Sequence, residues 1–189
     1  MKLVTYRASV EGAARLGVIE GDSVIDAGRL GLPDSMLDLI EAGPAALQAL
    51  RAALPSAPWS ARLPLANVRL LAPIPRPRKN IFGIGLNYVE HVAESAASLD
   101  TAKDLPKQPV VFSKPPTTVI GPGEPIGHDA SMTKQLDWEV ELAVIIGTTA
   151  RRVPRNEALA HVFGYSVLID ISARDNRRAG QWIVSKGMD

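Results

Sequence analysis

The sequence contains no cysteine. Thiolate nucleophiles, disulfide bonds and cysteine-based zinc sites are therefore excluded, and the composition suits a reducing compartment. An excess of one charge is also missing, because 21 lysines and arginines nearly balance 20 aspartates and glutamates, for a net charge of +1. Nucleic-acid binding requires a basic surface, so nothing in the composition favours a nucleic-acid partner.

Long apolar runs are absent as well. The first residues, MKLVTYRASVEG, carry Arg7 and Glu11 where a secretory signal would have its apolar core, and no run approaches the ~20 residues of a membrane span. We therefore expect a cytoplasmic protein with no membrane association. The 189 residues are 46% hydrophobic, which suits a packed core in one domain, or in a small domain plus part of a larger one.

Two regions of different character follow one another along the chain, and together they predict an α+β, strand-rich protein. Residues 1–72 are expected to form a small α+β domain, and residues 73–189 a second, catalytic domain, because a proline-rich stretch separates them. The pattern predicts strands at 2–7, 14–28 (with a turn at Gly21-Asp22), 80–85, 109–114, 136–147 and 163–172, and helical segments at 35–54 (broken at Gly43-Pro44) and 156–161.

Three carboxylates occupy every second position of the strand predicted at 136–147. Because successive side chains point to opposite faces of a strand, Asp137, Glu139 and Glu141 should share one face. The strand continues into the apolar run 143–146, which is typical of strands covered on both faces, so the acids need a counter-charge. On a solvated sheet face the same alternation would carry no function.

The segment IFGIGLNYVEHVAES holds a second candidate site. Gly83 and Gly85 look like the start of a dinucleotide-binding fingerprint, but Tyr88 stands where that motif requires its third small residue. A helix start fits better, and it would place His91 and Glu94 on one helix face, so that the carboxylate orients the imidazole as a general base. Taken alone, such a pair is more often a surface pair.

Five short motifs follow one another in the second region: GLNYVEH, FSKP, DWEVEL, DISARD and QWIVSKGMD. In this order they closely resemble the fumarylacetoacetate hydrolase family, and the resemblance runs from about residue 70 to the last residue. It implies a mixed, rolled β-sheet core preceded by the small N-terminal domain, and usually a homodimer. Periodicity by itself indicates only strand-rich segments with few helices.

The resemblance implies a divalent-metal site at Glu139, Glu141 and Asp170. An all-oxygen ligand set suits a hard cation, Mg²⁺ or else Mn²⁺ or Ca²⁺. Asp137 receives no ligand role and is expected at the rim of the site. Without the companion motifs, Asp170 would read as a strand-end cap or a turn residue.

Catalytic roles are implied for four further residues. His91 and Glu94 would form a dyad that activates water or moves a proton, and Lys114 and Lys186 would stabilise an enolate or a carboxylate of the substrate. Each lysine taken alone reads as a solvated surface charge.

Three charged residues, Arg174, Asp175 and Arg177, lie in the DISARD motif or directly after it. Many relatives carry glutamine where this chain has Arg177, which would favour a more acidic substrate if the side chain faces the pocket. For Arg174 and Asp175, a structural ion pair is expected rather than a catalytic role.

The implied reaction is hydrolysis of a C–C bond in an acylpyruvate or another β-diketo acid, with the metal binding the 2-oxo acid and stabilising the enolate. The alternatives are isomerisation or decarboxylation of 2-hydroxymuconate-type or 2-oxo dicarboxylic acids in aromatic catabolism, and a non-catalytic relative that keeps the fold. Relatives continue beyond the lysine segment, so we expect an incomplete domain with an open sheet edge beside the metal carboxylates, poor activity and self-association.

Overall fold

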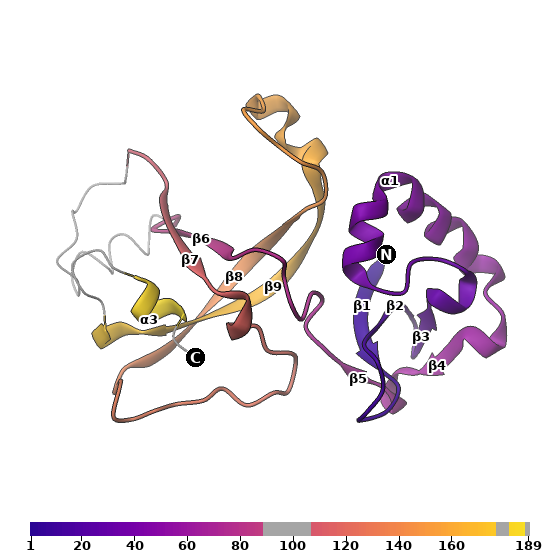
Figure 1. Cartoon of the computed structure of the whole chain (residues 1–189), viewed down its shortest axis with the longest axis horizontal. Coiled ribbons are helices and arrows are strands. Elements are labelled where there is room, and N and C mark those ends of the chain that lie inside the picture. Colours follow the sequence, from indigo (N-terminus) through magenta and orange to yellow (C-terminus); the bar gives the residue numbers. More distant parts are fainter. Residues whose placement is uncertain (89–106, 177–181, 188–189) are drawn as a thin grey trace. The chain divides into compact units, whose positions relative to one another are not determined.

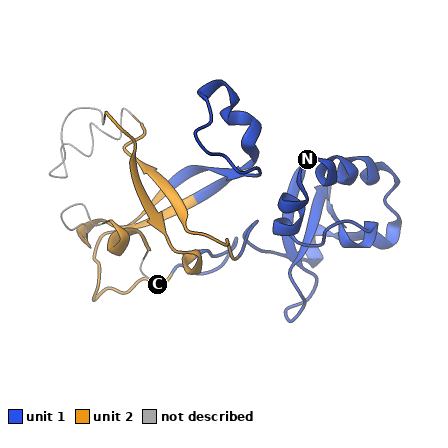
Figure 2. Ribbon diagram, turned by 45° about the horizontal axis from the view of Figure 1, so that its top comes forward, with its two compact units in different colours: residues 1–75, 119–126, 140–168 blue, residues 76–118, 127–139, 169–189 orange. Residues whose placement is uncertain are grey.

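The computed structural model describes residues 1–88, 107–176 and 182–187. Contacts divide the chain into two compact units, one of residues 1–75, 119–126 and 140–168, the other of residues 76–118, 127–139 and 169–189 (Figure 2). The predicted α+β, strand-rich class is confirmed. In the described ranges, no helix combines the length and the apolar character that a bilayer crossing requires.

The N-terminal residues contain a five-stranded antiparallel sheet. Its strand order is β4-β3-β2-β1-β5. The predicted turn at Gly21 is confirmed, and this glycine has a φ of 56°, a left-handed conformation that favours glycine. The strands are β1 (Lys2–Arg7), β2 (Arg15–Glu20), β3 (Ser23–Asp26), β4 (Arg62–Pro64) and β5 (Arg69–Leu70).

One helix, α1 (Met36–Ala53), packs its apolar residues against this sheet. The Ser35 hydroxyl caps its first turn by accepting from the Asp38 N–H at 3.1 Å. Gly43, with φ 76° and ψ −165°, interrupts the helix just before Pro44, where the sequence predicts the break. Leu39 and Leu50 are fully buried in the core.

A buried polar group ties β1, β2 and β3 together. The Tyr6 hydroxyl and the Arg15 Nε each donate to Asp26 Oδ2 at 2.6 Å, and the Arg29 N–H donates to Asp26 Oδ1 at 2.9 Å. Burial alone would raise the pKa of Asp26, but the hydrogen bonds from Arg15, Tyr6 and Arg29 outweigh it and lower that pKa. Burial, followed by the hydrogen bond to Asp26, raises the pKa of Tyr6.

Two antiparallel ribbons carry the motifs of the second region (Figure 1). In the first, β6 (Ile81–Gly85) pairs with β7 (Val110–Lys114), and the short helix α3 (Ile183–Gly187) packs against β7. In the second, β8 (Leu136–Ile146) pairs with β9 (Val162–Ala173). The Gly147 N–H donates to His161 O at 2.8 Å at one end, and the Arg174 N–H donates to Gln135 O at 2.9 Å at the other, so this ribbon is antiparallel.

The predicted strands of this region are confirmed, and the helix predicted at 156–161 is a 3₁₀-helix. Short 3₁₀-helices connect the strands in both units: η1 (Gly28–Leu30), η2 (Leu54–Ser56), η3 (Trp59–Ala61), η4 (Leu65–Asn67), η5 (Pro116–Thr118), η6 (Arg155–His161) and η7 (Arg174–Asn176).

The two faces of the β8–β9 ribbon differ in exposure. The less exposed face, called the inner face below, carries the acids, and the more exposed outer face carries large apolar side chains. From Asp137 onward, side chains alternate in exposure along β8, as predicted, with the acids on the less exposed face. The expectation that both faces of 143–146 are covered is wrong in the part of the chain that the structure describes, because Val144 and Ile146 are 49% and 56% exposed. The same outer face exposes Trp138, Val140, Leu142, Tyr165, Val167 and Ile169. Among the described residues β8 and β9 pair only with each other, so each has the open edge that the sequence predicts.

Candidate metal centre

Three carboxylates come together on the inner face of the β8–β9 ribbon. Glu139 and Glu141 alternate with exposed apolar residues on β8, and Asp170 lies near the end of β9 with its side chain 3% exposed. One carboxylate oxygen from each of the three lies within 4.8 Å of the others. The structure thus brings together the three residues that the sequence proposes as metal ligands.

Two lysines from other elements meet these acids. Lys114, at the end of β7, places its Nζ 2.6 Å from Asp170 Oδ1 and 2.9 Å from the carbonyl oxygen of Ile171. Lys186, on α3, places its Nζ 2.7 Å from Asp170 Oδ2 and 3.0 Å from both carboxylate oxygens of Glu139. Both side chains are buried, at 11% and 2% exposed. These lysines are the counter-charge that buried acids require, and neither is the solvated surface charge it would be taken for alone.

Arg174 closes the cluster on its more exposed side. Its guanidinium lies 2.5 Å from Glu139 Oε1 and 2.8 Å from Asp137 Oδ2. The hydrogen bond from Arg174, only partly opposed by burial, lowers the pKa of Asp137. With 44% of its side chain exposed, Asp137 lies at the rim, as expected.

The ion pair predicted between Arg174 and Asp175 is wrong. Asp175 instead accepts from the Thr133 hydroxyl and, at 2.9 Å, from the Lys134 N–H. These two hydrogen bonds lower the pKa of Asp175. Side chains at positions i and i+1 of a helical turn point in different directions, which is why Arg174 reaches the acids of β8 while Asp175 does not.

The donor set fits a hard divalent cation. Three carboxylates offer oxygen ligands only, and each carboxylate has roughly four lone-pair positions, so an oxygen that accepts from a lysine can still bind a metal ion. Ser172, two positions after Asp170 and therefore on the same face of β9, donates to Glu139 Oε1 at 3.2 Å and orients that carboxylate. The motifs gave Ser172 no role. Its position two residues after Asp170, which places both side chains on one face of a strand, is the sequence signal that could have found it.

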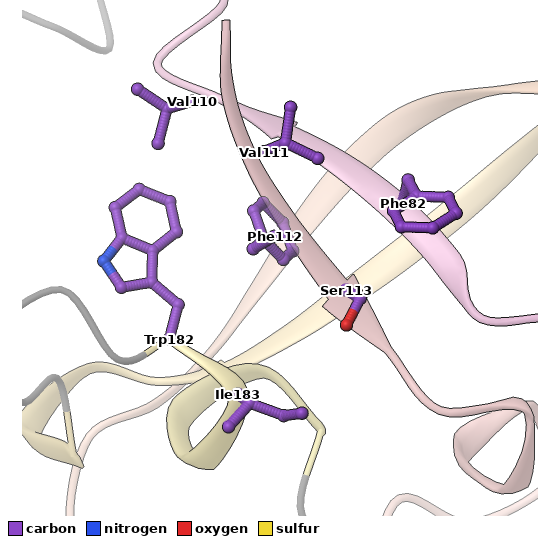
Figure 3. A pocket seen from close by; sticks show the side chains of 7 residues that line it. All are labelled: Phe82, Val110, Val111, Phe112, Ser113, Trp182 and Ile183. Carbon is purple, nitrogen blue, oxygen red and sulfur yellow. The ribbon is translucent and has the colours of Figure 1, made fainter.

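An open apolar pocket of about 550 Å³ lies along the β6–β7 ribbon. Figure 3 shows its lining, which comes from β6, β7 and the start of α3: Phe82, Val110, Val111, Phe112, Ser113, Trp182 and Ile183. One lining residue, Phe112, also contacts the cluster, because the Lys186 Nζ lies 4.9 Å from the centroid of its ring. His91, Glu94 and Arg177, which the sequence also proposes, lie outside the described residues.

Known proteins are similar to this chain over its whole length. The sequence model described as "Fumarylacetoacetate (FAA) hydrolase C-terminal" matches residues 80–189. "Oxaloacetate tautomerase fahd2, mitochondrial" of Xenopus laevis is 35% identical over 196 residues, which cover 100% of this chain and 58% of that protein.

Solved structures agree with this match. "Fumarylacetoacetate hydrolase (EaFAH)" from psychrophilic Exiguobacterium antarcticum superposes with a TM-score of 0.74 at 34% identity, covering 100% of this chain and 62% of that one. Maleylpyruvate hydrolase from Sphingobium sp. SYK-6, solved with manganese(II) and pyruvate, has a TM-score of 0.71 at 32% identity, over 94% and 60% of the two chains. The chain spans about three fifths of the length of these relatives.

Proposed function

The chain belongs to the fumarylacetoacetate hydrolase family, and we propose that it carries the divalent-metal centre of an enzyme that converts a small 2-oxo acid through its enolate. The observation that carries this proposal is the cluster of Glu139, Glu141 and Asp170 beside two buried lysines. A purely structural ion-pair cluster needs no third carboxylate within 4.8 Å of the other two. Three carboxylates that offer oxygen ligands to one point are the kind of ligand set that a hard divalent cation takes.

We assign the metal to Glu139, Glu141 and Asp170, with Mg²⁺ or Mn²⁺ as the expected ion. When bound, the ion would supply a Lewis acid that polarises the 2-oxo group. The chain's own residues supply the rest of the environment. Lys114 and Lys186 hold Asp170 from both sides, so its carboxylate is fixed before any ligand arrives.

The two lysines also suit the substrate. Enolate formation moves negative charge onto an oxygen, and buried ammonium groups stabilise that charge more strongly than solvated ones would. We propose that Lys186, which is bonded to the acids and lies against the ring of Phe112, donates to the developing enolate oxygen. His91 with Glu94 remains our proposal for the group that moves the proton to or from carbon.

Two reactions share this enolate step. Keto–enol tautomerisation of a 2-oxo diacid needs proton transfer and charge stabilisation only, and the relative from Xenopus laevis that aligns with the whole chain is named an oxaloacetate tautomerase. Hydrolysis of a C–C bond in an acylpyruvate needs an activated water in addition, and the solved maleylpyruvate hydrolase favours it. We place tautomerisation first and C–C hydrolysis second.

A two-arm assay separates them. In the first arm, enol-oxaloacetate is diluted into buffer with Mg²⁺ or Mn²⁺, and the loss of its ultraviolet absorbance is compared with a blank that holds the same ion without protein. In the second arm, pyruvate released from an acylpyruvate is measured with lactate dehydrogenase. Acceleration in the first arm alone supports tautomerisation, and release in the second supports hydrolysis.

A matched pair of variants ties either activity to the metal centre. Glu139→Gln should abolish the acceleration, whereas Glu157→Gln, an exposed acid of η6, should retain it. No acceleration in either arm at any ion concentration would remove the proposed function. Equal activity of the two variants would remove the assigned centre.

A further inference from the structure

The ring of Phe112 lies against the ammonium group of Lys186. The Nζ is 4.9 Å from the ring centroid, inside the ~6 Å range in which a cation is attracted to the negative face of an aromatic ring. The same Nζ is bonded to Glu139 and Asp170. Lys186 is therefore held by carboxylates and by a ring at the same time.

Gly83 makes room for that ring. Gly83 on β6 is the direct partner of Phe112 on β7, and a methyl group added to Gly83 would overlap the ring atoms. Gly85 does the same for Trp182, since an added Cβ would come within 2.5 Å of its Cζ3 atom. Gly83 and Gly85, which look like part of a dinucleotide fingerprint in the sequence, thus leave space for two aromatic rings.

Trp182 packs beside Phe112, over the same face of β6. The ring centroids are 5.5 Å apart, tilted by 48°. Figure 3 shows the Trp182 side chain beside that of Phe112, where the start of α3 meets β7. Phe112 thus lies over Gly83 and against Trp182, and in that position its ring meets the Lys186 ammonium group.

We propose that Phe112 is a positioning residue, which fixes the Lys186 ammonium group between Glu139 and Asp170. The Phe112 ring in turn requires glycine at position 83, which leaves the space that the ring occupies. The role of Lys186 toward substrate rests on the function proposed above, but its placement by Phe112 does not. Loss of the attraction to the ring should reduce the stabilisation that Lys186 gives to a negatively charged group by about 2- to 30-fold. This is the range of a cation–π interaction from exposed to desolvated sites.

The placement can be tested without any turnover. Protons above the face of an aromatic ring resonate upfield, so in the full chain labelled with ε-¹³C-lysine, Lys186 should give an upfield-shifted ε signal, assigned by its loss in Lys186→Met. Phe112→Leu and Gly83→Ala should each return the signal to the position of exposed lysines. Gly164→Ala, on β9 with nothing within 4 Å of the added carbon, and Val111→Ala should leave it in place.

A second pair of variants separates ring electrostatics from ring shape. Pentafluorophenylalanine at position 112 keeps the shape and removes the negative face, and the same substitution at Phe163, which lies near the start of β9 and lines neither the pocket nor the acid cluster, is the control. With an active protein, the change at 112 should lower kcat by about 2- to 30-fold with KM unchanged, and the change at 163 should alter neither kcat nor KM.

The spectra test the role of Phe112, and the activity assays test the proposed function. An unshifted Lys186 signal in the wild-type chain, or one that survives Phe112→Leu and Gly83→Ala, overturns the proposal even if the protein is a fully active enzyme. If neither reaction is catalysed, the proposed function fails while the lysine spectra still decide the role of Phe112. If Phe112→Leu does not fold, the Gly83→Ala spectrum and the fluorinated ring decide it.

Discussion

Replacement of Lys186 by methionine should destabilise the second unit in the absence of divalent ions, and divalent ions should restore more stability to the variant than to the wild type. Methionine keeps most of the apolar length of the lysine side chain and removes its charge. That charge is 2% exposed and lies within 3.0 Å of three carboxylate oxygens. The variant therefore leaves two acids with one counter-charge fewer.

The magnitude follows from what remains around those acids. Removal of one partner from a buried ion pair typically costs about 3–5 kcal/mol, because the other charge stays buried. Asp170 keeps Lys114 at 2.6 Å and Glu139 keeps Arg174 at 2.5 Å, so the cost should fall to about 2–3 kcal/mol. For a domain of this size that corresponds to a decrease in Tm of about 10–20 °C.

A bound cation should reverse this loss. An ion that binds only the folded state stabilises it by about 2.7 kcal/mol at 100 times its Kd. In the wild type, Lys186 repels the ion and donates to three of the oxygens it would use. Both effects vanish in Lys186→Met, so its Tm should rise more steeply with Mn²⁺ than that of the wild type.

The assay is thermal unfolding by circular dichroism, in chelator and in excess Mn²⁺, with Lys134→Met as the control because Lys134 is an exposed lysine of the same unit. The control should unfold like the wild type in both conditions. A Lys186→Met chain as stable as the wild type in chelator, or one that gains no more from Mn²⁺, would refute the view that Lys186 neutralises a metal-holding cluster.

Three further predictions concern ligands, catalysis and pH. The substitutions Glu139→Gln, Glu141→Gln and Asp170→Asn should each abolish divalent-ion binding in calorimetry without loss of the fold, and unchanged affinity in all three would remove the site. His91→Ala should bind the ion normally and lose ~10²-fold or more in turnover, so full activity would exclude His91 from the mechanism. The lowered pKa of Asp26 means that its contribution to stability is present above its unfolded pKa of ~3.9 and is lost as the pH falls through the folded value. The raised pKa of Tyr6 means that its contribution is present below ~10 and is lost at higher pH. Tyr6→Phe should flatten the alkaline limb of a pH–stability curve measured with urea, and an unaltered limb would contradict this assignment.

The sequence predicted what depends on neighbouring residues. The strands, the turn at Gly21 and the break at Gly43 follow from side-chain alternation and from backbone conformations that glycine adopts without strain. The shared face of Glu139 and Glu141 follows from the period of a strand, which needs no knowledge of the tertiary structure. The fold family came from the order of five motifs, since no single one of them is specific.

Contacts between distant segments could not be obtained in that way. Lys114 and Lys186 lie 56 and 16 positions from Asp170, and nothing local selects them over other lysines. Gly83 suggested a nucleotide motif because its true partner, the Phe112 ring, comes from another strand. The apolar run of β8 likewise indicated burial on both faces, although only the packing of other elements decides whether a face is covered.

The cluster also limits how single substitutions can be interpreted. Glu139 accepts from Lys186, Arg174 and Ser172, and Asp170 accepts from both lysines. Groups that share partners do not contribute additively, and coupling energies of about 0.5–3 kcal/mol are usual between residues in contact. Loss of Lys114 would therefore leave Lys186 to compensate Asp170, and each single variant would understate the dependence of the site on its positive charge. A double-mutant cycle of Lys114→Met and Lys186→Met measures that dependence, and a combined loss equal to the sum of the two single losses would show that the two lysines do not act on one carboxylate.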